Sequence, residues 1–592
     1  MTSIEQEPLL APVDLPRRRW FSRSSSANPL HVMLSIGLYV FFGLLLIWPI
    51  LWIVKTGFTR PSGTPTLDYF VLVFKDPALV HGLINAVLVA VFTTLLTLII
   101  SMPLAILSTR YSFPGRGFLN GLLLVPLVLP PFVGAIGMQI VLGRFGPLTQ
   151  IVGGGAMGID WIGKYRAVGV VVIEALHLYP VMLLNLQAAL ANIDPAMEQA
   201  AANMGAGRGR IFRRITMPMI RPGLFAGCTL VLIWSFTELG TPLMFNFYTI
   251  TPVQVFEQIN EVASNPLPYA LVVVMLLASA ALYLVGKVLL GRGFDAATTK
   301  ASVAAAPHRL RGWQAAAAML AFGIVFLLAV LPHISVVLVS VSATGAWYKS
   351  FLPAHFTFDH YRQALVDPLA VPSVWRSLQY ASGATVLALI VGYAAAVVVV
   401  RSNIRNRWLI DALAMLPLAV PGLVLSFGYL SISIWIKGKW GSHTPFFLDV
   451  QEWPAVILVL AYAARRLPYV VRAAAAGLQQ TPRDLELAAA NIGASRVVVL
   501  RRITIPLILA NLIAGALLAF AFAMLEVSDS LILAQRIQYY PITKAILDLS
   551  QRLGDGLYIA SALGVWAMVL LTLTILAANA LLGKKLGAVF RL

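Results

Sequence analysis

Two stretches of the chain carry the same pattern: EQAAANMGAGRGRIFRRITMPM, from Glu198 to Met219, and ELAAANIGASRVVVLRRITIPL, from Glu486 to Leu507. They align without a gap. Both contain the run Ala-Ala-Ala-Asn, a glycine two residues after it, the segment Arg-Arg-Ile-Thr and a proline. Such a shared spacing indicates a duplicated functional element rather than a chance similarity.

Each copy is expected to fold as a helix, a break and a second short helix. Asp194 before Pro195 and Thr481 before Pro482 are predicted to cap the first helices, because both pairs fit an N-cap followed by a first-turn proline. The alanine-rich turns that follow favour helix. We call each helix-break-helix unit a knob.

Gly205 and Gly493 directly follow the alanine-rich turns, so each is predicted to end its helix in the left-handed conformation. The chain then resumes as a basic amphipathic segment. Pro218 and Pro506 are predicted to end that segment. A pair of amphipathic helices that merely lie on the membrane surface is the alternative, but it needs no repeated spacing.

The composition places the knobs in a membrane protein. Of 592 residues, 59% are hydrophobic and 11% are charged, which is typical of a chain that crosses a bilayer many times. The net charge of +19 does not indicate nucleic-acid binding, because no zinc-finger spacing and no basic stripe with interleaved aromatics accompany it. The single cysteine, Cys228, allows no disulfide framework and no cysteine metal site.

Twelve apolar runs are long enough to cross a hydrocarbon layer of about 30 Å. They lie at 31–55, 80–108, 117–142, 166–191, 223–247 and 267–291, and again at 313–341, 374–400, 408–436, 453–478, 508–534 and 557–583. The fold class is therefore an all-α polytopic membrane protein made of two six-helix sets. In PLVLPPFVGAIG and PLAVPGLVLSFG, at matching places of the two sets, Pro and Gly predict a break within a span.

A polar, basic, small-residue segment separates the two sets, as expected of a linker between membrane domains. The predicted organisation is a cytoplasmic tail at 1–29, a first membrane domain at 30–291 with its knob at 193–222, a linker at 292–312, and a second membrane domain at 313–592 with its knob at 481–510. Because each set has an even number of spans, the two are parallel repeats related by a pseudo-twofold axis along the membrane normal.

Lysine and arginine are concentrated on the side that holds both termini, the linker and the two knobs. By the positive-inside rule this side is cytoplasmic. The chain itself offers no convincing nucleotide site. The nearest match to a phosphate-binding loop, GIDWIGKY from Gly158, has Tyr where Ser or Thr is required.

Charged residues inside the predicted spans need a partner or a watery cavity. The candidate acids include Glu174, and His177 and Arg465 occupy equivalent positions of the two halves. The candidate residues of a translocation pathway are His177, Glu238, Arg465, Glu526 and Asp529. We expect Arg465 to pair with Glu526 or Asp529 and Arg466 to brace the bundle. The sequence leaves two readings open, since these residues can line the solute path or form buried ion pairs between spans.

The duplicated knob resembles the EAA loop of the permease subunits of ABC importers, whose pattern is Glu-Ala-Ala, three residues, Gly, nine residues and Ile-x-Leu-Pro. Here Gln199 and Leu487 stand where the family has its Glu, with the acid one residue earlier. The resemblance implies type I ABC importer transmembrane domains with no enzymatic activity of their own. It also implies that the knobs contact an ATPase, through Glu198, Ala200, Ala201, Gly205, Arg213, Pro218, Glu486, Ala488, Ala489, Gly493, Arg501 and Pro506.

Among such permeases, a fused double permease of this length looks most like the ferric iron permeases, with 2-aminoethylphosphonate, thiamine and polyamine permeases as alternatives. The resemblance implies a bacterial inner-membrane location with both termini cytoplasmic, and an ATPase dimer that carries ATP and Mg, so that this chain binds no cofactor. It further implies a periplasmic or extracellular solute-binding protein, contact with membrane lipid and no nucleic acid. The outward histidines have no metal spacing, so no metal site is predicted.

Two rival functions from other classes also fit a twelve-span chain. An ion-coupled secondary transporter would use Glu238 or Glu526 and would work without an ATPase. A non-transporting membrane scaffold is the other rival. Neither explains why the cytoplasmic knobs are duplicated.

Overall fold

The computed structural model describes residues 29–153, 165–290, 307–348 and 350–582. The predicted tail at 1–29, except its last residue, lies outside these ranges. The same holds for the linker at 292–312 up to residue 306 and for all of GIDWIGKY but its final tyrosine.

The described part of the first half is almost entirely helical. Its elements are α1 (Pro29–Phe42), a π-helical turn (Gly43–Ile47), α2 (Trp48–Gly57), α3 (Asp68–Lys75), α4 (Pro77–Arg110), β1 (Tyr111–Ser112), α5 (Arg116–Leu122), α6 (Val125–Val128), α7 (Pro131–Val141), α8 (Pro147–Gly153), α9 (Arg166–Ala191), α10 (Pro195–Asn203), α11 (Arg208–Ile211), a π-turn (Phe212–Thr216), α12 (Met217–Phe236), α13 (Gly240–Met244), α14 (Thr251–Glu257), a 3₁₀ turn (Gln258–Glu261) and α15 (Leu267–Leu290).

The second half repeats this order. Its elements are β2 (His308–Arg309), α16 (Trp313–Ser340), α17 (Asp359–Val366), α18 (Ala370–Arg401), α19 (Arg407–Ala419), α20 (Gly422–Trp440), 3₁₀ turns (Gly441–His443 and Phe446–Leu448), α21 (Pro454–Gln480), α22 (Arg483–Asn491), α23 (Arg496–Val499), a π-turn (Leu500–Thr504), α24 (Ile505–Met524), α25 (Ser528–Leu533), a 3₁₀ turn (Ile537–Tyr539), α26 (Ile542–Ser550) and α27 (Gly556–Leu582).

Ten helices of the described chain are long and apolar enough to span a membrane, and two further spans are bent pairs. The predicted spans 117–142 and 408–436 are these pairs, with bends of 87° and 99°. The bends fall at the prolines that the sequence singled out. The residue before each proline, Leu129 or Val420, has the extended backbone that proline imposes on its predecessor.

The predicted spans 223–247 and 508–534 are too long. The membrane helices α12 and α24 end at Phe236 and Met524, and short helices, α13 and α25, follow. Glu238 and Glu526 therefore lie in the breaks and not within a regular helix. An apolar composition that continues past the break explains why the sequence did not reveal the ends.

The knobs confirm part of the capping prediction. The Asp194 carboxylate accepts a hydrogen bond from the amide of Ala196 at 2.9 Å, as an N-cap does. The prediction for Thr481 is wrong, because Pro482 is the N-cap residue and the Thr481 hydroxyl donates back to the carbonyl of Gly477 at 3.0 Å. A threonine before a proline is therefore not enough to assign the cap, because its hydroxyl can bond back into the preceding helix.

The glycine bends are as predicted, with φ of +83° at Gly205 and +88° at Gly493. The predicted ends at Pro218 and Pro506 are wrong, because the chain runs without a break from the π-turns into α12 and α24. Each proline is the second residue of its helix. Its missing N–H falls at the change from π to α geometry, where the helical bonding is already interrupted.

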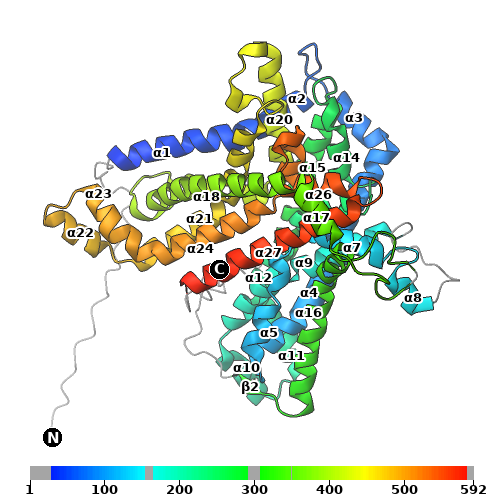
Figure 1. Ribbon diagram of the computed structural model, residues 1–592. Coiled ribbons are helices and arrows are strands. Elements are labelled where there is room, and N and C mark those ends of the chain that lie inside the picture. The colour runs from blue at the N-terminus through cyan, green and yellow to red at the C-terminus, as the bar shows by residue number, and fades with distance from the viewer. Residues whose placement is uncertain (1–28, 154–164, 291–306, 349, 583–592) are drawn as a thin grey trace, which may run out of the picture.

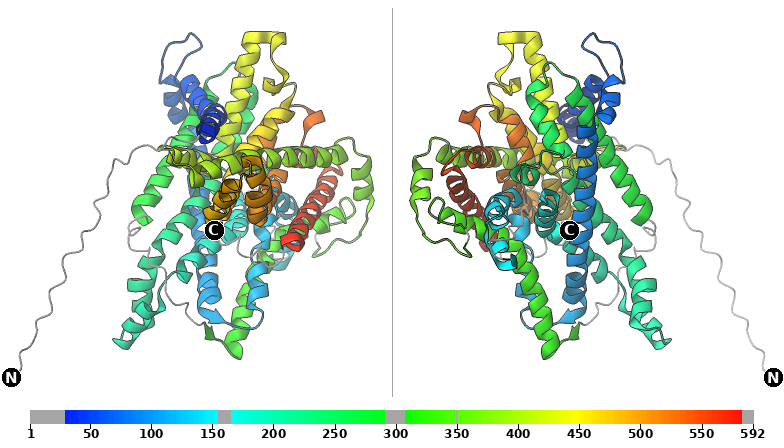
Figure 2. Two further views of the ribbon diagram at one scale, coloured as in Figure 1. Left: turned by 90° about the vertical axis from the view of Figure 1, so that its left-hand side faces the viewer. Right: turned by 90° about the vertical axis from the view of Figure 1, so that its right-hand side faces the viewer.

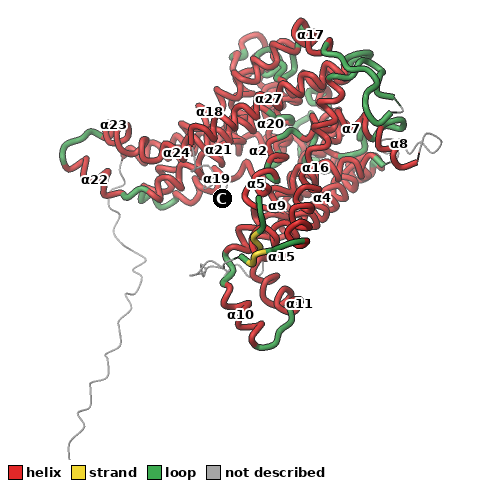
Figure 3. The backbone as a smooth tube through the Cα atoms, turned by 60° about the horizontal axis from the view of Figure 1, so that its bottom comes forward, coloured by secondary structure: helices red, strands yellow, loops and turns green. Residues whose placement is uncertain are grey.

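The long helices form two bundles that meet at one end and diverge at the other. Helices α4, α9 and α12 make one bundle, and α18, α21 and α24 make the other. The two knobs stand at separate free ends of these bundles (Figures 1 and 3). The connection between α20 and α21 lies at the end opposite to α10 and α11 (Figure 2).

The first span of each half packs on the other half. Helices α1 and α2 contact α18, α19 and α20, while α16 contacts α4, α5, α7 and α9. The Tyr429 hydroxyl donates to the carbonyl of Leu45 at 2.7 Å, and the Tyr39 hydroxyl donates to that of Asn406 at 3.0 Å. This exchange joins the halves into one body.

A short parallel pairing also joins the two halves beyond the end of α4. Tyr111 pairs with His308 and Ser112 with Arg309, so the end of the linker forms a strand beside the end of α4. The amide of Leu310 adds a bond of 2.9 Å to the carbonyl of Ser112.

Candidate functional site: the knobs and the central cavity

The knobs present one face outward and keep the other against the protein. Of the predicted contact residues, Ala200, Ala488, Gly205, Gly493, Arg213 and Arg501 are exposed, Pro506 is exposed and Pro218 is half-buried. Ala201 and Ala489 are buried, and Glu198 and Glu486 turn inward. The arrangement gives each knob a surface of small residues and arginines.

The sequence analysis missed the most prominent side chains of this surface. Met204 and Ile492, directly before the glycine bends, are 82% and 88% exposed. Leu487, within α22, is 49% exposed. An apolar residue between Asn and Gly in both copies was the available signal, since a large apolar side chain at a loop tip indicates contact with another molecule.

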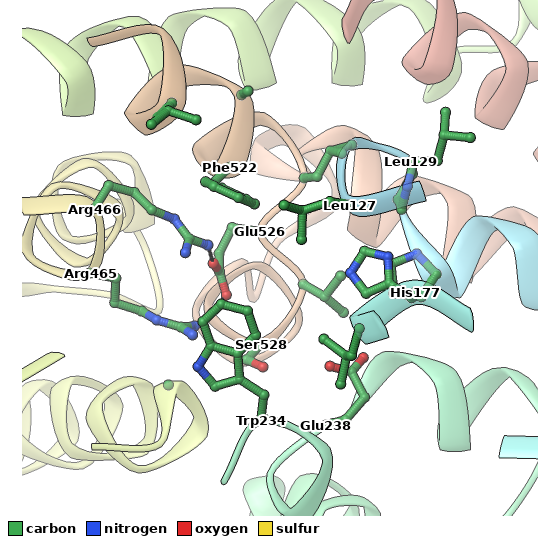
Figure 4. A pocket seen from close by; sticks show the side chains of 18 of the residues that line it. Leu127, Leu129, His177, Trp234, Glu238, Arg465, Arg466, Phe522, Glu526 and Ser528 are labelled. Atoms are coloured by element: carbon green, nitrogen blue, oxygen red, sulfur yellow. Dashed lines mark hydrogen bonds and ion pairs between the residues drawn. The ribbon is translucent and has the colours of Figure 1, made fainter. Parts of the chain in front are cut away.

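A cavity of about 250 Å³ lies where the two bundles meet. Both halves contribute to its wall, from the bend before α7 and from α9 and α12 on one side, and from α21, α24 and the break before α25 on the other (Figure 4). Of the predicted pathway residues, His177, Glu238, Arg465 and Glu526 line it, whereas Asp529 lies behind Arg465. The structure thus brings together residues that are far apart in sequence.

The second-half wall is a compensated ion network. Arg465 Nη1 is 2.5 Å from Glu526 Oε1 and 3.8 Å from Asp529 Oδ1, and Arg466 also donates to Glu526. The Ser426 hydroxyl donates to Asp529, and the Arg466 guanidinium lies 5.6 Å from the ring of Phe522. Two guanidinium groups are therefore matched by two carboxylates.

Gly422, at the bend before α20, makes room for this network. A Cβ atom at Gly422 would lie 1.9 Å from Arg465 Nη1. The glycine therefore allows the guanidinium group to lie against the bend, where it can reach Glu526.

The acids of the first-half wall, Glu174 and Glu238, form no ion pair within the described chain. Glu238 Oε1 accepts from the amides of Gly240 at 3.1 Å and Thr241 at 3.4 Å. Glu174 accepts from the Ser235 hydroxyl through one oxygen, and its other oxygen has no partner among the described residues. Among the described residues of the cavity wall, the ion pairs are thus confined to the second half.

His177 does not contact Glu238 but lies 2.9 Å, through Nδ1, from the carbonyl of Pro126. In a regular helix this carbonyl would accept from residue 130, which is a proline and has no N–H. The imidazole supplies the missing donor. His333 Nε2 lies 3.3 Å from the carbonyl of Pro130 at the same bend, so α16 also supports it.

A half-buried lysine lies at the interface between the halves. Lys544 Nζ donates to the carbonyl of Leu531 at 2.6 Å and lies 5.2 Å from the ring of Tyr540 and 5.7 Å from that of Phe256 in the other half. Burial lowers the pKa of Lys544 to about 8, and nearby Asp548 opposes this shift.

Within the described residues, no group of three or more His, Cys, Asp or Glu side chains could hold a metal ion.

Two tandem six-span repeats, a knob in each and a shared central cavity are the architecture of a binding-protein-dependent permease. The model of the family described as binding-protein-dependent transport system inner membrane component matches residues 98–293 and 384–586, one copy in each half and more than half of the chain in total. The chain belongs to this family.

Several curated proteins are similar over much of the chain. The ferric transport system permease protein of Actinobacillus pleuropneumoniae is 26% identical, over 84% of this chain and 70% of that protein. An Fe(3+)-transport system permease protein of Haemophilus influenzae is 24% identical, over 84% of this chain and 88% of that protein. The molybdenum transport system permease protein of Escherichia coli K12 is 35% identical over 27% of this chain and 71% of its own length.

Proposed function

We propose that the chain is the translocation subunit of an ATP-driven importer of ferric iron, with both membrane halves in one polypeptide. The family assignment supports the transport class, and the relatives of similar length named for ferric transport support the solute. A periplasmic binding protein would select the solute and deliver it to the face opposite the knobs. A separate ATPase dimer would hold ATP and Mg on the knob side, where both termini would also lie.

The charge balance of the cavity carries the solute proposal. On the second-half wall the two arginines are matched by Glu526 and Asp529. On the first-half wall Glu238 reaches the cavity, accepts hydrogen bonds from two backbone amides and forms no ion pair within the described residues. A carboxylate in excess at membrane depth is costly unless a cation offsets it, so the cavity suits a positively charged solute.

Uptake of radiolabelled ferric iron tests this proposal. The permease is reconstituted in liposomes with its ATPase and binding protein, and Glu238→Gln is compared with Glu257→Gln, an exposed acid at the end of α14. We expect Glu238→Gln to lower iron uptake by at least tenfold with normal assembly, and Glu257→Gln to leave it unchanged. Equal uptake by Glu238→Gln and the wild type would contradict a role for this carboxylate.

An oxyanion importer is the second candidate, because two arginines line the cavity and Arg466 Nε is buried without a partner in the described chain. A partial relative is named for molybdenum transport. The same liposomes, offered molybdate or 2-aminoethylphosphonate, separate the two candidates. Uptake of an oxyanion and not of iron, with dependence on Arg466 instead of Glu238, would support this second candidate. Uptake of thiamine or a polyamine instead of iron would agree with a cationic solute but would contradict ferric iron as that solute.

A further inference from the structure

The acid of the first knob is engaged inside this chain. Glu198, in the first turn of α10, accepts hydrogen bonds on Oε1 from Arg110 Nη2 at 2.9 Å and from the Thr216 hydroxyl at 2.7 Å. Arg110 is the last residue of α4, and Thr216 ends the π-turn before α12. One carboxylate oxygen therefore joins the knob to two membrane helices.

The second knob repeats the arrangement. Glu486 Oε1 accepts from the Thr504 hydroxyl at 3.1 Å and lies 3.6 Å from Arg401 Nη2, at the end of α18. Arg401 Nη2 also donates to the carbonyl of Thr481 at 2.9 Å. The same three residue types meet at the same place in both halves, with a longer ion-pair distance in the second.

Both groups are shielded from water. The side chains of Arg110 and Glu198 are 18% and 22% exposed, and those of Arg401 and Glu486 are 13% and 21% exposed. Thr216 and Thr504 are buried. An ion pair that is desolvated to this degree and carries an additional hydroxyl donor holds its geometry better than an exposed pair does.

The geometry of the helices gives these groups a mechanical role. Between α10 and the π-turn the chain passes through a glycine bend and the single turn of α11, which are exposed or half-buried. The Arg-Glu-Thr group bypasses this segment and connects α10 directly to α4 and α12, which pack on each other and on α9 beside the cavity. A displacement of α10 is thereby transmitted to the cavity wall.

We propose that Glu198 and Glu486 are positioning residues that connect each knob to the cytoplasmic ends of two membrane helices, and that they do not contact the ATPase. The ATPase meets the outward face, with Met204 and Ile492 at its tips. This inference rests on the proposed function for the presence of an ATPase. The internal contacts themselves do not depend on it.

The test separates attachment of the ATPase from transmission of its movement. Glu198→Gln combined with Glu486→Gln keeps the size and one acceptor oxygen of each side chain. We expect the affinity for the ATPase to stay within twofold of the wild type, while the solute imported per ATP hydrolysed falls at least fivefold. Asp484→Asn, which neutralises an exposed acid on α22, is the matched control and should change neither quantity.

Charge exchange gives a second test. Arg110→Glu and Glu198→Arg should each uncouple import, and the double exchange should recover at least half of the solute imported per ATP. Glu198→Gln alone should have a larger effect than Glu486→Gln, since its ion pair is the shorter one. Loss of ATPase affinity in the Gln variants with an unchanged import ratio would overturn the proposal, because the acids would then be contact residues.

A third measurement needs no ATPase. Spin labels at Met204 and at the exposed Phe118 on α5 report the position of the first knob relative to the membrane helices of the same half. We expect one narrow distance distribution in the wild type and a clearly broader one in Glu198→Gln. An unchanged distribution would contradict the proposal, whereas failure of the wild type to bind an ATPase would contradict the proposed function alone.

Discussion

The two walls of the cavity come from the two copies of one repeat, but a polar side chain at the same position finds a different partner in each. At equivalent positions the first half has His177, which lies 2.9 Å from a backbone carbonyl, and the second has Arg465, which forms an ion pair with Glu526. By contrast, the Arg-Glu-Thr groups under the knobs are alike in both halves. The Arg-Glu-Thr groups are thus the same in the two halves, whereas the side chains that line the cavity differ. This is expected if both knobs have the same role and share a single solute path.

The largest effect on import is expected at the left-handed glycine bends, which both halves share. Changing Gly205 and Gly493 together to Val forces a β-branched residue into the left-handed region, which costs about 1–2 kcal/mol at each site. An added Cβ would meet no atom within 4 Å at either position, so the cost is in the backbone. We expect import to fall more than tenfold, measured as solute uptake by the reconstituted transporter.

Gly207→Val is the control for this variant. Gly207 has φ of −67° and equally open surroundings, so the same side chain is tolerated there. Wild-type import by the Gly205/Gly493 variant would show that the left-handed bends do not shape the knobs.

The next effect distinguishes the halves. Arg465→Ala leaves carboxylates buried without their partner, at a cost of about 3–5 kcal/mol. His177→Ala leaves one buried carbonyl without its donor, at a cost of about 1–3 kcal/mol. Thermal unfolding in detergent should therefore show a larger loss for Arg465→Ala. A larger loss of stability for His177→Ala would mean that the ion network of Arg465 stabilises the protein less than the hydrogen bond of His177.

A smaller effect is expected for Lys544 of α26, which lies against Phe256 of the first half. Because its pKa in the folded protein is lowered to about 8, the folded state binds fewer protons than the unfolded state between about pH 8 and the ordinary lysine value. Its unfavourable contribution is full below pH 8 and shrinks as the pH rises. The stability advantage of Lys544→Met over the wild type should therefore decrease from pH 7.5 to 9.5, and a constant difference would contradict the lowered pKa.

The smallest effect is expected for the one-residue difference between the knobs. Gln199 and Leu487 occupy equivalent, exposed positions. Leu487→Gln removes apolar surface from the second knob only, so ATPase affinity should fall by about threefold, or roughly 0.6 kcal/mol. Gln199→Leu should not lower the affinity. Identical responses to both exchanges would remove this reason to regard the knobs as specialised.

Much of the fold followed from patterns that extend over many residues. The apolar runs and the repeated spacing predicted the spans, the two halves and the glycine bends, because these features depend on local composition and backbone conformation. Features that depend on which of several partners a side chain chooses were harder to predict. Thr481 looks like a cap in sequence, but its hydroxyl finds an acceptor one turn back.

The candidate site divides in the same way. The pairing of Arg465 with Glu526 was predicted from the need of a buried charge for a partner. The shared use of Glu526 by Arg466 was not, because it depends on the approach of α21 to the break after α24. Likewise, the inward orientation of Glu198 and Glu486 could not be deduced from the repeats, since the arginines that hold them lie on other helices.

The exchange of first spans has a consequence for how the protein is made. Helices α1 and α2 are synthesised before α18, α19 and α20, yet much of the surface on which they pack belongs to those later helices, which follow hundreds of residues further along the chain. The first half therefore cannot reach its final packing when the ribosome reaches the linker. Helices α1 and α2 lack this packing surface until the second half has been made. Assembly is thus a late, joint event of one nascent chain rather than the docking of two finished domains.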